Sequence, residues 1–412
     1  MPSAVSRVAA PVRAAARAPS LVGAAFRTTV AIRLAYWLVA AVALLWTPLR
    51  GHAISPFRVY GPLSDLFFGA FAHWDSVWFV HVADHGYDSK QVTAFFPLYP
   101  LAVRALSHPF GSTVVAGVVL SLVSGGVGVA VVHRLGRAYL MRAGAWDAVL
   151  LIALYPLAFV FTAVYSDGLF LALSAGSFLA ATKRRSVTAG LLGGLAVATR
   201  LIGLALLPAL LVLLWPRSRA LRELLKPLPL VFLPLALVLY ALYLQRHFGD
   251  ATAFAHAESM FWNRHTPALG PLSGLWDAVS SGYHGGGEIV RHLPRTGGAP
   301  HGYVHRDQWA AWNVVQLLLL VAALWLTVVA WRRLGPAFGL YSAAFVAVFL
   351  STPADLVPLV SEPRFLLTDF PLFLALGSVT ERHPHLRLTL LCTFSAVGAV
   401  TAVAFSRGAW IA

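Results

Sequence analysis

One polar and aromatic stretch interrupts an otherwise apolar chain: residues 71–87 read FAHWDSVWFVHVADHGY. Read as a helix, this stretch places a stripe of five side chains on one face, namely Phe71, Trp74, Trp78, His81 and His85. Asp75 lies about 100° around the helix from Trp74, beside the stripe. A carboxylate in such a pocket can take a proton from a hydroxyl. The plain alternative is a helix at the membrane surface whose Asp75 faces water.

Other polar groups in the same stretch are weaker candidates. Asp84 follows Asp75 by nine residues, so it points to roughly the opposite side and is not expected to pair with it. His81 and His85 have the i, i+4 spacing of metal ligands, but the sequence fixes no third ligand. We therefore predict no metal site here, and we assign the histidines to the membrane interface.

Two arginines are candidates for binding a phosphate, because a guanidinium binds phosphate oxygens bidentately. Arg200 interrupts the apolar stretch 187–215, and an ionisable residue at membrane depth is a functional candidate. Arg364 opens the stretch SEPRFLLTDFPLFLALG at 361–377. The alternatives are a structural ion pair for Arg200 and an arginine reaching to the interface for Arg364.

Two short motifs complete the set of candidates. AFFPLYPL, residues 94–101, contains Pro97 and Pro100, each of which disfavours helix for the residue before it. A rigid apolar turn there could hold a lipid chain or a sugar ring, or it could simply begin the next span. YSDGLF, residues 165–170, places Asp167 in a short polar turn between two spans.

The composition predicts what carries these residues. Of 412 residues, 58% are hydrophobic and 11% are charged, against about a quarter charged in a soluble domain. Apolar runs of about 18 residues recur, which predicts an all-α polytopic membrane protein with about 9–11 membrane segments. The net charge of +15 is then a matter of membrane topology, and no nucleic acid is expected. Cys392 is the one cysteine, so no internal disulfide can form.

Hydropathy and charge together predict the order of the spans. Candidate spans lie near 28–49, 113–133, 148–165, 167–182, 228–248, 309–331, 337–351, 365–380 and 386–406. The short basic clusters can all be cytoplasmic only if 187–215 enters the membrane and returns, as a broken hairpin with its turn near 198–203. One long tilted helix is the alternative.

This topology divides the chain into a tail, one membrane domain and two large outer loops. Residues 1–27 form a basic cytoplasmic tail, and 28–412 form a single transmembrane domain. The outer loops span 50–112, which carries Asp75, and 249–308, a possible lid over the acceptor. We expect a multi-pass protein of the cell membrane with its N-terminus in the cytoplasm and its active site on the outer face.

Five stretches in this order resemble the polyprenol- or dolichol-phosphate-mannose-dependent mannosyltransferases related to GPI mannosyltransferase II (PIG-V), including their bacterial homologues. The resemblance covers about residues 70–380 and leaves 249–308 unmatched. It rests on HWDSVWFVHVADHGY, AFFPLYPLAVRAL, YPLAFVFTAVYSDGLFLALSAGSFLA, RRSVTAGLLGGLAVATRLIGLALLPALL and EPRFLLTDFPLFLALG.

The resemblance implies a GT-C glycosyltransferase fold, a lipid-phosphate sugar donor and an inverting single displacement on the non-cytoplasmic face. It assigns Asp75 as the catalytic residue, and we add Arg200 and Arg364 as the groups that bind the donor phosphate. No cofactor or divalent metal is expected, and the partners are the donor, the bilayer and an acceptor lipid, glycan or protein. We expect the sugar and lipid pocket to be formed by Trp74, Trp78, His85, Tyr87, Phe96, Pro97, Tyr99 and Asp167.

Two other classes of function stay open at this stage. A transporter or flippase of a lipid-linked sugar would share the broken hairpin and the intramembrane arginine. It would predict inverted repeats, which the sequence does not show, and it would leave Asp75 unexplained. A non-catalytic partner of a glycosylation complex would resemble the enzyme in everything except Asp75.

Overall fold

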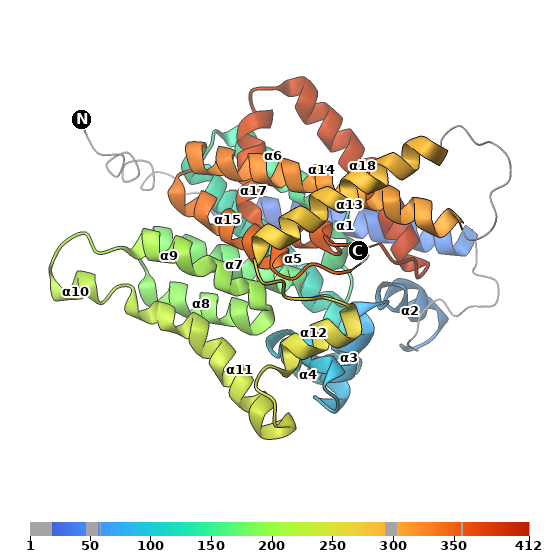
Figure 1. Ribbon diagram of the computed structural model, residues 1–412, viewed down its shortest axis with the longest axis horizontal. Helices are drawn as coiled ribbons and strands as arrows, with labels where there is room; N and C mark the ends of the chain where they lie inside the picture. Colours follow the sequence, from blue (N-terminus) through green and yellow to red (C-terminus); the bar gives the residue numbers. More distant parts are fainter. Residues whose placement is uncertain (1–18, 47–56, 58, 293–302, 356, 412) are drawn as a thin grey trace.

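The described part of the chain is helical throughout. The computed structural model describes residues 19–46, 57, 59–292, 303–355 and 357–411 (Figure 1). Within these residues the only β-type pairing is one isolated antiparallel bridge between Arg264 and Ala354. The prediction of an all-α membrane protein is confirmed.

The α-helices of the described residues differ widely in length. In chain order they are α1 Pro19–Trp46, α2 Pro62–Phe67, α3 Asp75–His85, α4 Leu98–Phe110, α5 Thr113–Tyr139, α6 Arg142–Leu154, α7 Asp167–Thr182, α8 Ser186–Thr199, α9 Leu206–Leu214, α10 Leu221–Leu224, α11 Phe232–Phe248, α12 Ala253–Trp262, α13 Pro271–His292, α14 Tyr303–Arg333, α15 Pro336–Leu350, α16 Glu362–Thr368, α17 Phe370–Thr380 and α18 Pro384–Ser406. Short 3₁₀ turns are η4 Gly69–Phe71, η5 Gln91–Ala94, η6 Ala158–Phe161, η7 Leu201–Ala205 and η8 Leu228–Val231.

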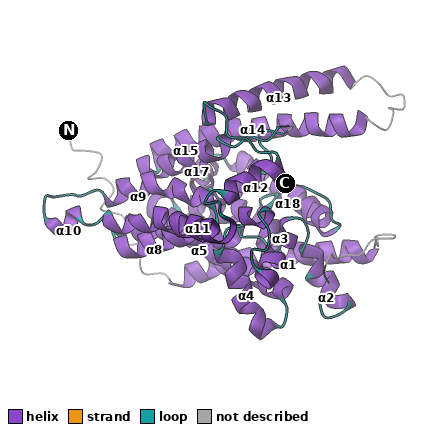
Figure 2. Cartoon of the chain, turned by 60° about the horizontal axis from the view of Figure 1, so that its bottom comes forward, coloured by secondary structure: helices purple, strands orange, loops and turns teal. Residues whose placement is uncertain are grey.

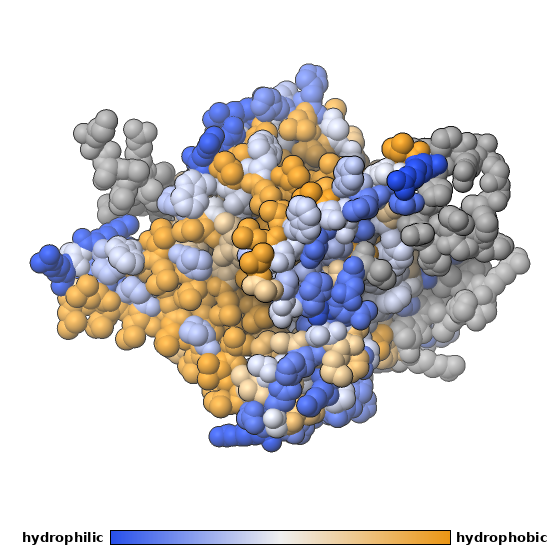
Figure 3. All heavy atoms as spheres, in the orientation of Figure 1, coloured by the Kyte–Doolittle hydropathy of each residue, from blue (hydrophilic) through white to orange (hydrophobic). Residues whose placement is uncertain are grey.

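Five segments are long and apolar enough to cross a bilayer, a property that requires about 20 residues. They are Val22–Trp46, Thr113–Tyr139, Leu221–Phe248, Trp309–Arg333 and Pro384–Ser406. Five shorter apolar helices pack among them. The surface reflects this division: apolar side chains cover α8, α9 and α11, whereas hydrophilic ones gather over α3, α4 and α12 (Figure 3).

The broken hairpin is present. α8 ends at Thr199, Arg200 is extended (φ −158°, ψ 138°), and η7 and α9 continue the chain. The Nη1 of Arg184, just before α8, donates to the carbonyl of Leu213 near the end of α9 at 3.1 Å. Arg184 also bonds Glu223 at 2.6 Å. The chain therefore returns to the level at which it entered, as the basic clusters predict.

Three predicted segments differ from the structure. The helix predicted over 71–87 begins only at Asp75, because Trp74 has a left-handed backbone. The span predicted at 148–165 ends at Leu154, since Pro156 disfavours helix at the residue before it. The span predicted at 365–380 consists of α16 and α17, which meet at Asp369.

The first and last boundaries of the membrane domain also shift. α1 begins at Pro19, so residues 19–27 of the predicted tail belong to the first helix. Residues 1–18 and the end of the first predicted span, 47–49, lie outside the described residues. α14 begins at Tyr303, so its first turns belong to the predicted outer loop 249–308.

Small residues let the central helices approach closely, as is usual between membrane helices. A Cβ on Gly168 of α7 would lie 2.6 Å from the carbonyl oxygen of Ser121 in α5. A Cβ on Gly190 of α8 would lie 2.1 Å from the carbonyl oxygen of Pro229. These contacts fix α7 and the hairpin against their neighbours, and α7 and Arg200 both contribute to the site described next.

Candidate active site

Asp75 is the first residue of α3, and the backbone directly before it is strained. Trp74 has φ 58° and ψ −120°, a conformation that costs a non-glycine residue about 1–3 kcal/mol. Its indole Nε1 donates to the carbonyl of Ala409 at 3.1 Å, which ties this turn to the segment after α18. Asp75 follows this strained residue, and a helix N-terminus favours a negative charge there.

Asp75 forms an ion pair with Arg364 of α16. The Asp75 side chain stays 26% exposed, so one side of its carboxylate is open, whereas Arg364 is largely buried. Arg364 lies over the rings of Tyr165 and Phe365, at 5.3 and 5.4 Å from their centroids. Its Nε is buried and has no hydrogen-bond partner among the described residues. This guanidinium therefore has a donor to spare for another acceptor.

Arg200 and Asp167 form a second ion pair beside the first. Asp167 is the first residue of α7 and is almost fully buried, and Arg200 occupies the break between α8 and η7. The guanidinium carbon of Arg200 lies 4.6 Å from the centroid of Phe365. Phe365 thus brings Arg200 and Arg364 into one group, although 163 residues of chain separate them.

A third arginine completes the group. Arg264 lies 5.9 Å from the Phe365 centroid and 3.2 Å from the carboxylate of Glu258. Its two terminal nitrogens donate to the carbonyls of Thr352 and Val360 at 2.9 Å each. Arg264 therefore uses its donors to hold the loop that leads into α16. We call Arg200, Arg264 and Arg364, with their carboxylate partners around Phe365, the arginine cluster.

A buried carboxyl lies close to the cluster in sequence. Glu362 is the first residue of α16 and is fully buried, and neither of its oxygens has a hydrogen-bond partner among the described residues.

The predicted pocket residues fall into two groups. Trp74 is exposed next to Asp75 and Asp167 belongs to the arginine cluster, so both lie at the site. Trp78 stacks on Phe95 and meets Trp262 of α12 edge-on, at centroid distances of 6.3 and 6.5 Å. The predicted loop 249–308 therefore packs, through α12, on the helix that carries Asp75.

The other predicted pocket residues lie in packing positions. Tyr99 is fully buried, and its hydroxyl hydrogen-bonds Ser121 at 2.7 Å. Phe96 packs on Tyr240, and the hydroxyl of Tyr87 donates to the carbonyl of Phe95. Pro97 caps α4, and His85 stacks on His81 at the exposed end of α3. Contact of these residues with a sugar or lipid stays a prediction.

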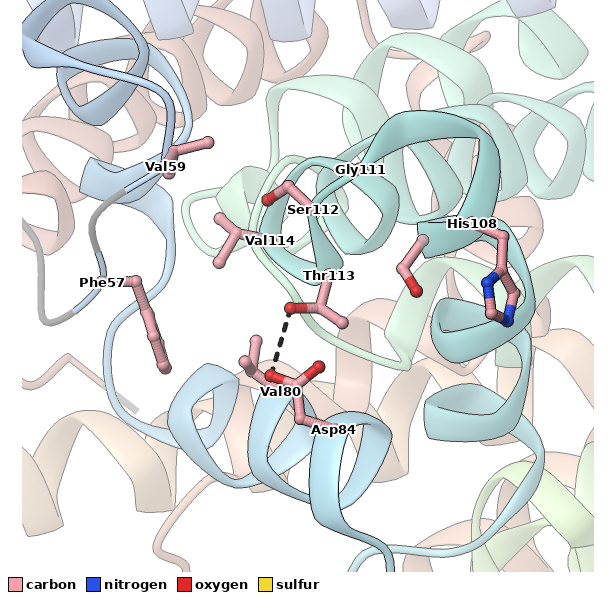
Figure 4. Close-up of a pocket in the computed structure, with 10 residues that line it drawn as sticks. Phe57, Val59, Val80, Asp84, His108, Gly111, Ser112, Thr113 and Val114 are labelled. Carbon is pink, nitrogen blue, oxygen red and sulfur yellow. Dashed lines mark hydrogen bonds between the residues drawn. The ribbon is translucent and has the colours of Figure 1, made fainter.

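A pocket of about 520 Å³ lies on another side of α3 (Figure 4). Its lining includes Asp84, whose carboxylate accepts a hydrogen bond from Thr113 at 3.3 Å. Asp75 and Asp84 therefore have different partners, in line with their half-turn separation on the helix. Among the described residues no group of three or more His, Cys, Asp and Glu side chains could hold a metal ion.

Sequence reasoning did not find Arg264, Glu258 or Phe365. Arg264 and Glu258 lie in the loop 249–308, for which no motif was available, and their place depends on tertiary contacts. The RF pair at Arg364–Phe365 was a local signal, because an aromatic ring next to an arginine can support cation–π contacts.

Comparisons with known proteins show the family of the chain. The family model "Mannosyltransferase (PIG-V)" matches residues 36–318, which include Asp75, Asp167, Arg200 and Arg264, whereas Arg364 lies beyond the match. A stretch of 109 residues is 28% identical to GPI mannosyltransferase 2 of Drosophila pseudoobscura pseudoobscura. It covers 24% of this chain and 24% of that protein, so only about a quarter of the relative's length is matched. The family model covers well over half of the chain, and the chain belongs to the mannosyltransferase (PIG-V) family.

Proposed function

We propose that the protein is a membrane mannosyltransferase. It transfers mannose from a polyprenyl-phosphate-mannose donor to a hydroxyl of a lipid, glycan or protein on the non-cytoplasmic face of the membrane. The reaction inverts the anomeric carbon, with Asp75 as the general base. Membership of the family and the helical membrane architecture support the transferase, and the basic clusters support the sidedness.

One observation carries the proposal: a partly open carboxylate directly contacts a guanidinium that has an unused donor. A sugar donor with a phosphate leaving group needs a base for the acceptor and cations for the phosphate. Asp75 and Arg364 supply both within one contact, and Arg200 lies in the same cluster. If no cation lay near the base, the site would be better suited to a leaving group other than phosphate.

The step balances as a single displacement. The acceptor hydroxyl gives its proton to Asp75 while its oxygen attacks the anomeric carbon from the face opposite the phosphate. The bond between the anomeric carbon and the phosphate oxygen breaks, and its electron pair leaves with the polyprenyl phosphate. Arg364 and Arg200 stabilise the charge that develops on that phosphate. Because these guanidiniums supply the positive charge, the proposal needs no divalent metal.

In this proposal Arg364 binds two partners in turn, first the Asp75 carboxylate and then the donor phosphate. In the structure its guanidinium pairs with the Asp75 carboxylate. A donor phosphate would attract the same guanidinium and compete with Asp75 for it. We therefore propose that the donor binds first and that its phosphate prepares Asp75 for the acceptor.

The test is transfer by purified protein in lipid nanodiscs, with radiolabelled polyprenyl-phosphate mannose and a panel of candidate acceptors. We expect Asp75→Asn to lower the rate about 10²–10⁴-fold, the usual contribution of a general base. Asp147→Asn is the matched control, because Asp147 is a buried carboxylate that pairs with Arg387 far from Asp75 in the sequence. Rates are compared per amount of monodisperse protein.

Two outcomes would overturn the proposal. Equal transfer by the wild type and Asp75→Asn would remove Asp75 from the reaction. Absence of transfer by the wild type with every acceptor, together with movement of the labelled donor between leaflets, would favour a transporter of lipid-linked sugar.

A further inference from the structure

α13 lies within the predicted outer loop 249–308, and its side chains divide into three sectors. A rotation of about 100° per residue places the residues of each sector together. The first sector is an exposed apolar stripe within an arc of about 60°. We call it the α13 stripe, and it consists of Leu272, Trp276, Val279, Tyr283 and Val290, which are 44–79% exposed.

The second sector packs against the rest of the protein through small residues. A Cβ on Gly274 would lie 1.9 Å from the carbonyl oxygen of Leu350, at the end of α15. A Cβ on Gly285 would lie 2.5 Å from the carbonyl oxygen of Ala310 in α14, and one on Gly282 would meet Leu317. α13 and α14 accordingly lie side by side as a pair (Figure 2). α13 is a packed element of the fold.

The third sector is polar and faces neither of the others. It comprises Asp277, Ser280, His284 and Arg291. Asp277 lies 3.9 Å from His265, and His265 lies 3.2 Å from Asp355 in the loop that leads to α16. The polar sector thus turns toward the loops beside the arginine cluster, and the apolar stripe turns away from the protein.

The position of α13 along α14 shows what meets the stripe. Residues 309–333 of α14 are a candidate membrane span, and Ala310 and Leu317, which contact α13, lie inside it. On the same span Leu318, Val321 and Trp325 are exposed, as lipid-facing side chains are. Because α13 packs along this candidate span, we expect the α13 stripe to lie at the level of the bilayer.

We propose that the α13 stripe contacts the membrane lipid, so that α13 is a membrane-embedded helix and its polar sector borders the active site. Trp276 and Tyr283 are residue types enriched at the membrane–water boundary. A free lid over the acceptor would expose this stripe to water, at a cost of about 25 cal/mol per Å² of apolar surface. The inference rests on α14 spanning the membrane and is independent of the transferred sugar.

The test uses the full-length protein in phospholipid nanodiscs on a Cys392→Ala background. Single cysteines replace Trp276, Val279 or Tyr283, with Asp277, Ser280 or His284 as matched controls one residue away, and each carries a nitroxide. We expect the stripe positions to be relaxed by oxygen and to lose relaxation by a water-soluble nickel chelate, and the control positions to show the reverse. Equal nickel relaxation at both sets would mean that the stripe faces water. Protection of the stripe from both reagents would mean that protein covers it, and either result overturns the proposal.

A second measurement needs no substitution. Trypsin cleavage after Arg264 and Arg291 releases residues 265–291 as one peptide, which contains nearly all of α13. In nanodiscs that contain a phospholipid with a diazirine in its acyl chain, illumination should attach the lipid to this peptide at stripe residues. An unlabelled peptide beside a labelled α14 would contradict lipid contact.

Discussion

Two clusters of ion pairs lie toward opposite ends of the α16–α17 segment, and their hydrogen-bonding groups are satisfied to different degrees. In the Asp147 cluster, one carboxylate oxygen accepts from Arg387 at 2.6 Å and the other accepts from Thr380 at 2.9 Å. In the arginine cluster, by contrast, the Nε of Arg364 is buried and has no hydrogen-bond partner among the described residues. Arg364 also lies against aromatic rings that supply only weak acceptors.

We expect this difference to separate a structural lock from a binding site. Asp147 ties α6 to α17 and α18, and its own acceptor oxygens are both used. A buried donor without an acceptor costs about 1–3 kcal/mol, a cost that an incoming anion can remove. We therefore expect the arginine cluster, and not the Asp147 cluster, to bind an anion. Substitutions in the two clusters should affect different measurements.

The largest expected effect is on transfer. Arg364→Gln removes the cation that pairs with Asp75 and that we assign to the donor phosphate, so transfer should fall about 10²–10³-fold, as for other lost transition-state contacts. The rate of mannose transfer at saturating donor measures this loss. Arg387→Gln, the matching change in the Asp147 cluster, should leave the rate per folded molecule unchanged. Equal losses in both variants would mean that the two clusters do not differ in kind.

The next effect is on stability. Asp147→Asn removes the charge that binds Arg387, and a hydrogen bond to a charged group contributes about 1.5–3 kcal/mol. We expect the free energy of unfolding in detergent to fall by about 2 kcal/mol. Thermal unfolding followed by circular dichroism measures the change. A variant as stable as the wild type would show that the Asp147 cluster is not a lock.

Some of this arrangement could be predicted from the sequence. The break near Arg200 follows from two constraints, the length of the apolar stretch 187–215 and the basic clusters on both sides of it. Asp75, Arg200 and Arg364 stand out because polar residues are costly in an apolar chain. The structure brings all three to one place, yet their catalytic and binding roles stay predictions.

The rest depends on contacts that no local pattern encodes. The start of α3 at Asp75 requires a left-handed backbone at Trp74, which no residue preference favours for tryptophan. The place of Arg264 depends on two carbonyls 88 and 96 residues away in the chain. Tyr99 is an aromatic residue between two prolines in the sequence, and its burial depends on how α4 meets α5. Such features require the folded chain.

The smallest expected effect is a gain in affinity for the donor. It is also the most direct test of how the two clusters differ. If the donor phosphate has to compete with Asp75 for Arg364, removing the carboxylate charge should strengthen donor binding even as it stops transfer. We expect Asp75→Asn to bind polyprenyl-phosphate mannose about fivefold more tightly, a modest coupling between two sites. Equilibrium binding of the labelled donor without acceptor measures this, with Asp147→Asn expected to match the wild type. Weaker or unchanged binding by Asp75→Asn would mean that Arg364 is not shared, and donor binding would then have no means of preparing the base.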